Sequence, residues 1–175
     1  MGRQSRHAAV VDGVPVLVTD ALGPATVGVF RSRVLVPRWV LALPTLERKY
    51  VLRHEDEHRK ANDARLLCVM SLTLLLTPWN VALWWALRRL SLAVEMDCDT
   101  RVVAALGDAR TYSELLFKVA QATSHAPRLQ PGFIGRGMLE RRLKILLAPR
   151  ELRGTGRLML TAAAGGLLYI VLRTP

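Results

Sequence analysis

The sequence contains very few cysteines, and their placement excludes several classes of protein. Cys68 and Cys98 are the only two, and they form neither a disulfide framework nor a Cys-x-x-Cys pair. Nothing in the sequence therefore indicates an oxidising compartment. The N-terminal residues also lack the continuous apolar stretch of a secretory signal. With 175 residues and no internal repeat, the chain is long enough for one domain with a hydrophobic core, and not comfortably for two.

Acidic residues are scarce as well. The chain has 14 Asp and Glu against 25 Lys and Arg, a formal net charge of +11, yet 51% of its residues are hydrophobic. This combination favours a protein that contacts a membrane and keeps its Lys and Arg on the cytoplasmic side. Residues 127–157 alone hold eight Lys or Arg against two Glu. Because aromatic residues hardly interleave with these charges, we expect them to face lipid headgroups and expect no direct nucleic-acid partner.

The first part of the chain predicts strands followed by a helix. Gly13–Asp20 alternates and is rich in Val, and residues 25–30 and 33–37 are typical of a hairpin across a two-residue link. Thr45 follows Pro44 and can cap a helix. Further helices are predicted downstream. The predicted fold class is therefore α+β and mainly helical, with a small N-terminal sheet beside the first long helix.

That helix contains the sequence VLRHEDEHRKAND, in which His54 and His58 are separated by one helical turn. Residues i and i+4 share a helix face, so the two imidazoles can bind one ion. Glu55 lies about 100° round the helix from His54, where a general base can take a proton from a metal-activated water. The alternative is a charged, solvated helix face that spells the motif by chance.

A catalytic zinc has three protein ligands and one open position, so a third ligand is required. Glu95 and Asp99 lie four residues apart in VEMDCDTRV, on a later predicted helix. Glu95 can bind the metal, and Asp99 can orient a ligand histidine through its other ring nitrogen. The alternative is that both are ordinary surface acids. Cys98 could approach the metal, although a core cysteine is the simpler interpretation.

Two further residues could stabilise an oxyanion in such a site. Tyr112 and His125 both have side chains that are suited to this role. A packed tyrosine and a loop histidine are the simpler interpretations, and the sequence does not select between the two candidates.

Residues 66–87 contain no charge and would measure about 33 Å as one helix, enough to cross a bilayer. Metal binding constrains the path of this segment, because His58 and Glu95 bind the same ion and must lie on the same side of any membrane. We therefore predict an apolar helical hairpin that turns at Thr77–Asn80, re-entrant in a membrane or, as the alternative, buried in a soluble core. Residues 158–172 are also apolar, and we predict a C-terminal membrane helix within 157–175.

Several segments together resemble one family. HEDEHRKANDARL, PWNVALWWALRRLSLAVEMDCDTRV, the earlier GPATVGVFRSRVLVP and the later GRGMLERRLKILL are similar to the metallopeptidase domain of the BlaR/MecR family of bacterial antibiotic-sensing membrane proteins. The resemblance implies a zincin-like fold of the gluzincin type. It implies one Zn²⁺ per chain bound by His54, His58 and Glu95, with Glu55 as the general base and Asp99 as the residue that orients a ligand.

The resemblance also implies a function. Characterised members relay antibiotic detection towards inactivation of a cytoplasmic repressor, so we expect a membrane zinc endopeptidase, residues 1–156, facing the cytoplasm. Its expected partners are a protein substrate, with a repressor as one candidate, and membrane lipids; a homodimer stays open. We expect a reduced relative or a fragment, without the penicillin-binding sensor domain. The alternatives are a catalytically degenerate signalling scaffold and a quality-control protease like the heat-shock membrane zinc proteases.

Overall fold

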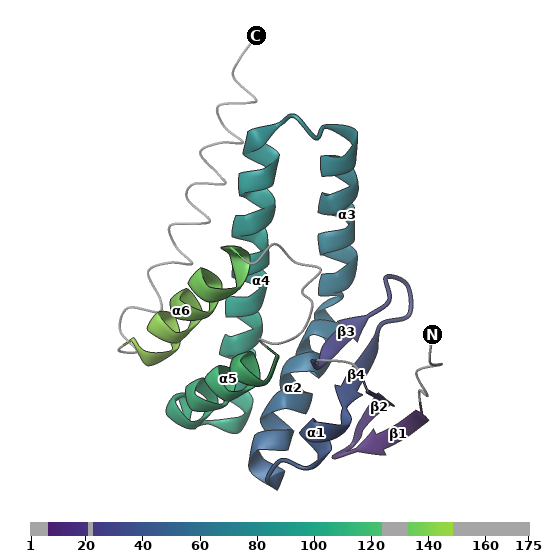
Figure 1. Cartoon of the computed structure of the whole chain (residues 1–175), viewed down its shortest axis with the longest axis vertical. Coiled ribbons are helices and arrows are strands. Elements are labelled where there is room, and N and C mark those ends of the chain that lie inside the picture. The colour runs from purple at the N-terminus through teal and green to yellow at the C-terminus, as the bar shows by residue number, and fades with distance from the viewer. Residues whose placement is uncertain (1–6, 21–22, 124–132, 149–175) are drawn as a thin grey trace.

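The computed structural model describes residues 7–20, 23–123 and 133–148, and within these a four-stranded sheet packs beside six helices (Figure 1). The strands are β1 (His7–Val11), β2 (Val14–Thr19), β3 (Ala25–Val27) and β4 (Arg33–Pro37). The helices are α1 (Arg38–Leu41), α2 (Thr45–Ala61), α3 (Asp63–Leu76), α4 (Val81–Leu106), α5 (Ala109–Thr123) and α6 (Phe133–Leu147). The predicted class, mainly helical with a small N-terminal sheet, is confirmed.

The sheet has the strand order β1-β2-β4-β3. β1 and β2 form an antiparallel hairpin whose turn residues, Asp12 and Gly13, both have positive φ. An Asp-Gly pair favours this turn because both positions tolerate the left-handed region. β3 and β4 form the second antiparallel hairpin, as predicted, and β2 pairs with β4 in parallel. β1 was not predicted, and β3 lies at the opposite edge.

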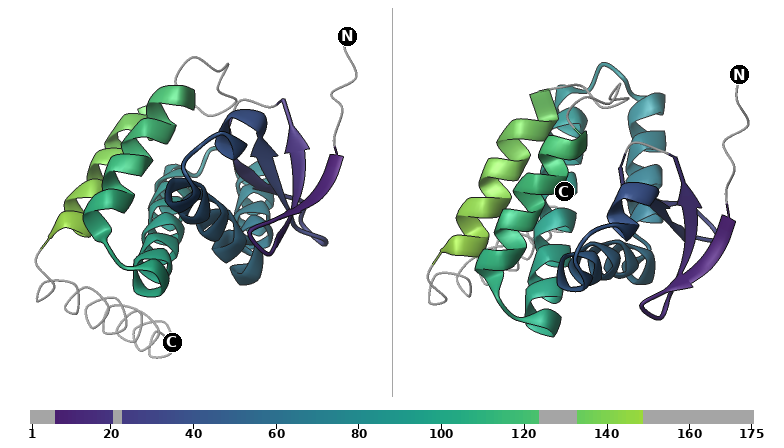
Figure 2. Two further views of the ribbon diagram at one scale, coloured as in Figure 1. Left: turned by 90° about the horizontal axis from the view of Figure 1, so that it is seen from below. Right: turned by 60° about the horizontal axis from the view of Figure 1, so that its bottom comes forward.

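α2 lies in the middle of the molecule, with the sheet on one side and α4 and α5 on the other (Figure 2). Its buried Tyr50 and Leu52 join Val34 and Val36 of β4 and Val102 of α4 in one core. Burial of such side chains contributes roughly 1.5–3 kcal/mol each. The helix that carries the histidine motif is thus held firmly from both sides.

α3 and α4 form an antiparallel hairpin that turns where it was predicted to turn, between Leu76 and Val81. Asn62 has left-handed backbone angles and separates α3 from α2, a conformation that asparagine adopts more readily than most residues. At the tip, the Asn80 side chain accepts a hydrogen bond from the Leu83 amide and caps α4. The hairpin returns the chain, so the middle of α4 lies against α2.

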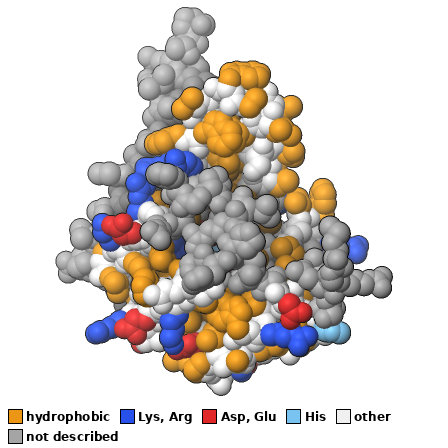
Figure 3. All heavy atoms as spheres, viewed as in Figure 1, with side chains coloured by type: hydrophobic (Ala, Val, Ile, Leu, Met, Phe, Trp, Pro, Cys, Tyr) orange, Lys and Arg blue, Asp and Glu red, His pale blue; other side chains and the backbone are white. Residues whose placement is uncertain are grey.

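The tip of this hairpin is apolar and exposed among the described residues. Leu75, Leu76, Trp79 and Val81 are each at least 74% exposed, and Figure 3 shows hydrophobic side chains gathered over this end of the molecule. The described residues therefore do not support the alternative, in which the hairpin is buried in a soluble core. No helix among them is long and apolar enough to cross a bilayer. The predicted membrane helix within 157–175 lies outside the described residues.

Candidate metal centre

The structure brings together the three side chains that the sequence predicted as metal ligands. His54 and His58 come from α2, and Glu95 comes from α4, which the hairpin folds back against α2. The Nε2 atoms of the two histidines are 3.2 Å apart. One Glu95 oxygen lies 3.6 Å from the Nε2 of His54, and the other lies 3.7 Å from the Nε2 of His58.

These separations fit one tetrahedral zinc ion. Bonds of 2.0–2.2 Å from zinc to nitrogen and oxygen place neighbouring ligand atoms roughly 3.3–3.5 Å apart. The observed separations of 3.2, 3.6 and 3.7 Å lie within a few tenths of an ångström of that edge, with a different Glu95 oxygen nearest to each histidine. Ligation by the two Nε2 atoms and one Glu95 oxygen would leave a fourth position for water, which is the arrangement of catalytic zinc sites.

Each histidine has its other ring nitrogen held by a neighbouring side chain. His58 Nδ1 lies 2.7 Å from a carboxylate oxygen of Asp63, the first residue of α3. His54 Nδ1 lies 2.9 Å from the hydroxyl of Tyr112 on α5. The Tyr112 hydroxyl donates its proton to Asp99, so it accepts from His54. Both contacts favour a proton on Nδ1, so Nε2, on the side of Glu95, is the nitrogen that each histidine can offer to a metal ion.

Asp99 acts on the site through Tyr112. Its Oδ1 atom is 3.6 Å from His54 Nδ1, but it accepts a hydrogen bond of 2.7 Å from Tyr112. Arg142 of α6 donates two hydrogen bonds of 2.7 Å to Asp99 and pairs with Glu95 at 2.8 Å. One guanidinium thus fixes both acids of α4, which would otherwise be two neighbouring negative charges with little access to water. No role was predicted for Arg142.

Cys98 belongs to the same cluster and offers a competing set of ligands. Ligand atoms of His54, His58 and Cys98 all lie within 4.8 Å of one another, and Cys98 is fully buried. Its sulfur, however, lies 3.3 Å from the Nδ1 of His54, the nitrogen that also contacts Tyr112. We therefore favour the set of two Nε2 atoms and Glu95, which leaves both outer hydrogen bonds intact.

Glu55 lies beside the cluster and is only 7% exposed. Thr26, on the edge strand β3, donates a hydrogen bond of 3.1 Å to its Oε2 atom. Burial raises the pKa of Glu55 above its ordinary value, against the lowering effect of His54 and His58. A carboxylate with a raised pKa is suited to accept and return a proton near neutral pH.

The motif is not a solvated helix face. Glu55, Asp56 and Glu57 are each 7% exposed or less, although three acids in succession are costly to bury. Asp56 pairs with Arg59 at 2.7 Å, and Glu57 pairs with Arg53 at 2.9 Å. The charge of each is compensated locally, which leaves Glu55 as the acid of this run that faces the histidines.

The protonation of the cluster sets a condition for metal binding. Burial lowers the pKa of His58, but the hydrogen bond to Cys98 and the charges of Cys98 and Glu95 together outweigh it, and the pKa rises to about 9. The pKa of His54 also lies well above 6.5, since contacts with Cys98 and Glu95 outweigh burial. Burial raises the pKa of Glu95, but His54 and Arg142 bring it down to about 2. A metal ion must therefore displace protons from both histidines near neutral pH.

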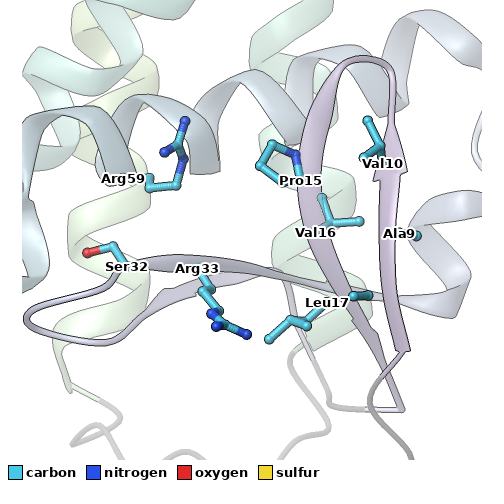
Figure 4. A pocket seen from close by; sticks show the side chains of 9 residues that line it. Ala9, Val10, Pro15, Val16, Leu17, Ser32, Arg33 and Arg59 are labelled. Carbon is cyan, nitrogen blue, oxygen red and sulfur yellow. The ribbon is translucent and has the colours of Figure 1, made fainter.

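One cavity among the described residues lies away from this cluster. It measures about 570 Å³ and lies against the β1–β2 hairpin, where Val10, Pro15 and Leu17 line it together with Arg33 and Arg59 (Figure 4). None of the predicted site residues lines it.

His125, one of the two candidates for an oxyanion donor, lies outside the described residues. Tyr112 is 1% exposed and holds His54, so its place in the structure is that of a positioning residue.

A helix with His-Glu-x-x-His and a glutamate from a second helix are the parts of a metallopeptidase site. The model of the BlaR1 peptidase M56 family matches residues 14–146, well over half of the chain, and the chain belongs to that family. The resemblance seen in the sequence is thereby confirmed. Membership supports a peptidase of the BlaR1 type. Comparison with curated proteins and with solved structures gives no match.

Replacement of Glu95 tests the ligand set. We expect Glu95→Ala to weaken zinc binding by at least about 100-fold, since even the loss of an outer hydrogen bond to a ligand costs about 10–100-fold. The measurement is a competition titration with a chromophoric chelator. Asp97→Ala removes an exposed acid from the same helix, one that pairs with Arg101, and should bind zinc like the wild type. Equal binding by all three proteins would contradict the assignment of Glu95.

The pKa values give a second prediction. At pH 7, zinc binding should release about two protons, one from each histidine, and the number should fall as the pH rises through about 9, the pKa of His58. Affinity should therefore increase from pH 6 to pH 9. Calorimetry in buffers of different ionisation enthalpy measures the release. Binding without proton release at pH 7 would contradict the raised pKa values of the two histidines.

Proposed function

We propose that this domain is a zinc-dependent endopeptidase that works at the cytoplasmic face of a membrane and cleaves a protein substrate. The observation that carries the proposal is the convergence of His54, His58 and Glu95 at the spacing of a tetrahedral zinc site, with the buried Glu55 beside it. Family membership supports the peptidase class.

A bound zinc ion would supply a Lewis acid that polarises the scissile carbonyl and lowers the pKa of a water molecule. The chain supplies the proton transfers. A Glu55 carboxylate oxygen takes one proton from the attacking water and then gives it to the nitrogen of the leaving amine. Thr26 donates to the Oε2 atom of Glu55 and so orients the carboxylate for this work. Asp63 and Tyr112 keep the two Nε2 lone pairs directed at one point.

Replacement of Glu55 separates catalysis from metal binding. We expect Glu55→Gln to bind zinc as the wild type does and to lower kcat/KM by about 100- to 10,000-fold, the usual range for the loss of a general base. Zinc content and hydrolysis of a quenched fluorescent peptide library provide the two readouts. Glu47→Gln, on the same helix at a surface ion pair with Lys118, is the matched control.

Two other functions predict different results in that experiment. A degenerate signalling scaffold would keep its signalling output in Glu55→Gln, and the wild type would cleave no peptide. A quality-control protease shares the chemistry but would cleave many unfolded proteins instead of one substrate. A transcriptional repressor as the substrate rests on the resemblance to the BlaR/MecR family alone.

The position of β3 supports a mode of substrate binding. Among the described residues β3 pairs with β4 alone, so its other edge is free. The same strand contacts the catalytic helix through Thr26, whose hydroxyl also lies 2.8 Å from the carbonyl of Glu55. An extended segment that adds to a free edge makes main-chain hydrogen bonds with it. We infer that the substrate binds as an extra strand beside β3.

Backbone methylation of the substrate tests this mode. N-methyl groups placed one at a time along a cleaved peptide should raise KM by about tenfold at alternate positions, because only alternate amides face the edge. The peptides keep every side chain, so side-chain recognition is unchanged. If KM stayed within twofold at every position near the scissile bond, addition beside β3 would be ruled out.

The membrane location rests on the α3–α4 hairpin. Its exposed tip gathers Leu75, Leu76, Trp79 and Val81, an apolar surface of the kind that marks interaction sites. The Trp84 indole donates to the Pro78 carbonyl at 2.8 Å and stiffens the turn. We infer that this tip enters the acyl region of one leaflet while the metal centre stays in water.

Spin labels on the hairpin measure its depth. In the full chain with Cys68→Ser, a nitroxide at Leu76→Cys should be more accessible to oxygen than to a water-soluble nickel complex once the protein is in vesicles. The label at Asp97→Cys, exposed on α4 near the metal centre, should show the opposite preference. Equal access of the nickel complex to both labels would contradict entry of the tip.

A further inference from the structure

A second cleft lies between α4 and α6 and has no role in the chemistry described above. It measures about 240 Å³. Three of its lining residues are arginines, and none is acidic. The lining residues that matter for its chemistry are Trp85, Arg88, Arg89, Leu92, Met138 and Arg141.

The three arginines have no acidic partner within the described ranges. Arg88, Arg89 and Arg141 are exposed and make none of the ion pairs found there. The next residue of α6, Arg142, is by contrast turned inward and fully paired with Glu95 and Asp99. Three like charges around one small cleft repel each other unless an anion lies among them.

The geometry of the cleft suits a phosphate group. Guanidinium groups bind phosphate oxygens through paired hydrogen bonds, and Arg88, Arg89 and Arg141 approach from two helices. The guanidinium of Arg89 stacks on the Trp85 ring at 5.2 Å from its centroid, which keeps it near the cleft. Trp85 and Leu92 add an apolar wall, as a ligand with both a phosphate and an apolar part requires.

The position of the cleft relative to the hairpin tip indicates where that ligand comes from. Val81 begins α4 at the tip, and Arg88 follows seven residues later, which corresponds to about 10 Å along the helix. A tip seated in the acyl region would therefore bring the cleft to the level of the headgroups. Tryptophan is enriched at that level, as is arginine on the cytoplasmic side.

We propose that this cleft binds the phosphate of an anionic phospholipid headgroup. The proposal rests on the membrane location inferred under the proposed function, and it adds a specific lipid site to it. Nucleic acid is a weaker match for two reasons. Trp85 is the only aromatic residue that lines the cleft, whereas single-stranded nucleic acid is bound by stacking its bases on several aromatic side chains. The same helix also begins at the apolar hairpin tip, which bases and phosphates would not cover.

The test uses the full chain in an uncharged detergent. Dioctanoyl phosphatidylglycerol and dioctanoyl phosphatidylcholine are titrated into the protein, and binding is followed by thermophoresis. Each arginine near an anionic lipid contributes roughly fivefold, so Arg88→Gln, Arg89→Gln and Arg141→Gln combined should weaken phosphatidylglycerol binding by about 100-fold. Arg33→Gln, Arg38→Gln and Arg110→Gln remove the same charge from other exposed sites and should change binding by less than threefold.

Three results would overturn the proposal. They are equal losses in both triple variants, equal binding of the two lipids by the wild type, and inorganic phosphate or a DNA duplex that competes as well as phosphatidylglycerol. Zinc content and peptide cleavage, measured on the same preparations, report on the proposed function separately. Loss of the lipid site with intact zinc binding and cleavage would overturn this proposal and leave the proposed peptidase function standing. Lipid binding without zinc binding or cleavage would overturn the proposed function instead.

Discussion

The geometry of the candidate site depends most on the pair of hydrogen bonds that holds the outer nitrogens of the two histidines. Asp63 binds one ring at 2.7 Å and Tyr112 binds the other at 2.9 Å, and together they turn both Nε2 atoms towards Glu95. These partners come from different helices. The bend at Asn62 must place Asp63 at the start of α3, and α5 must pack against α2 to bring Tyr112 within reach. Both bonds therefore depend on how α3 and α5 are placed relative to α2.

Charge compensation links the centre to the last described helix. Asp99 is buried and Glu95 is partly buried, and a buried acid without a partner destabilises a fold strongly. Arg142 supplies the partner for both and so ties α6 to Glu95, the candidate metal ligand. Its neighbour Arg141 lines the cleft proposed for a lipid phosphate. The proposed lipid contact and the candidate metal centre would therefore meet on adjacent residues of one helix, which would give the proposed membrane protease a physical route from its surroundings to its active centre.

The sequence predicted the parts of the site that depend on local spacing. His54 and His58 share a face because they are one turn apart, and the hairpin followed because both ends must reach one ion. The contacts between distant helices were not predictable in this way. Asp63 lies in the same segment as the histidine motif, but its spacing predicted no role for it. Tyr112 contacts His54 across 58 residues of sequence, and Arg142 contacts Asp99 across 43 residues. The strand β1 was missed because HAAVV lies at a sheet edge and alternates weakly.

The most direct measurement is X-ray absorption at the zinc edge of the zinc-loaded protein. It reports the elements bound to the ion and does not depend on a substrate. A centre formed by His54, His58 and Glu95 with water predicts a first shell of nitrogen and oxygen at about 2.0–2.2 Å, with the outer scattering of two imidazoles. A sulfur at about 2.3 Å would contradict it, because Cys98 would then occupy the position that catalysis needs open.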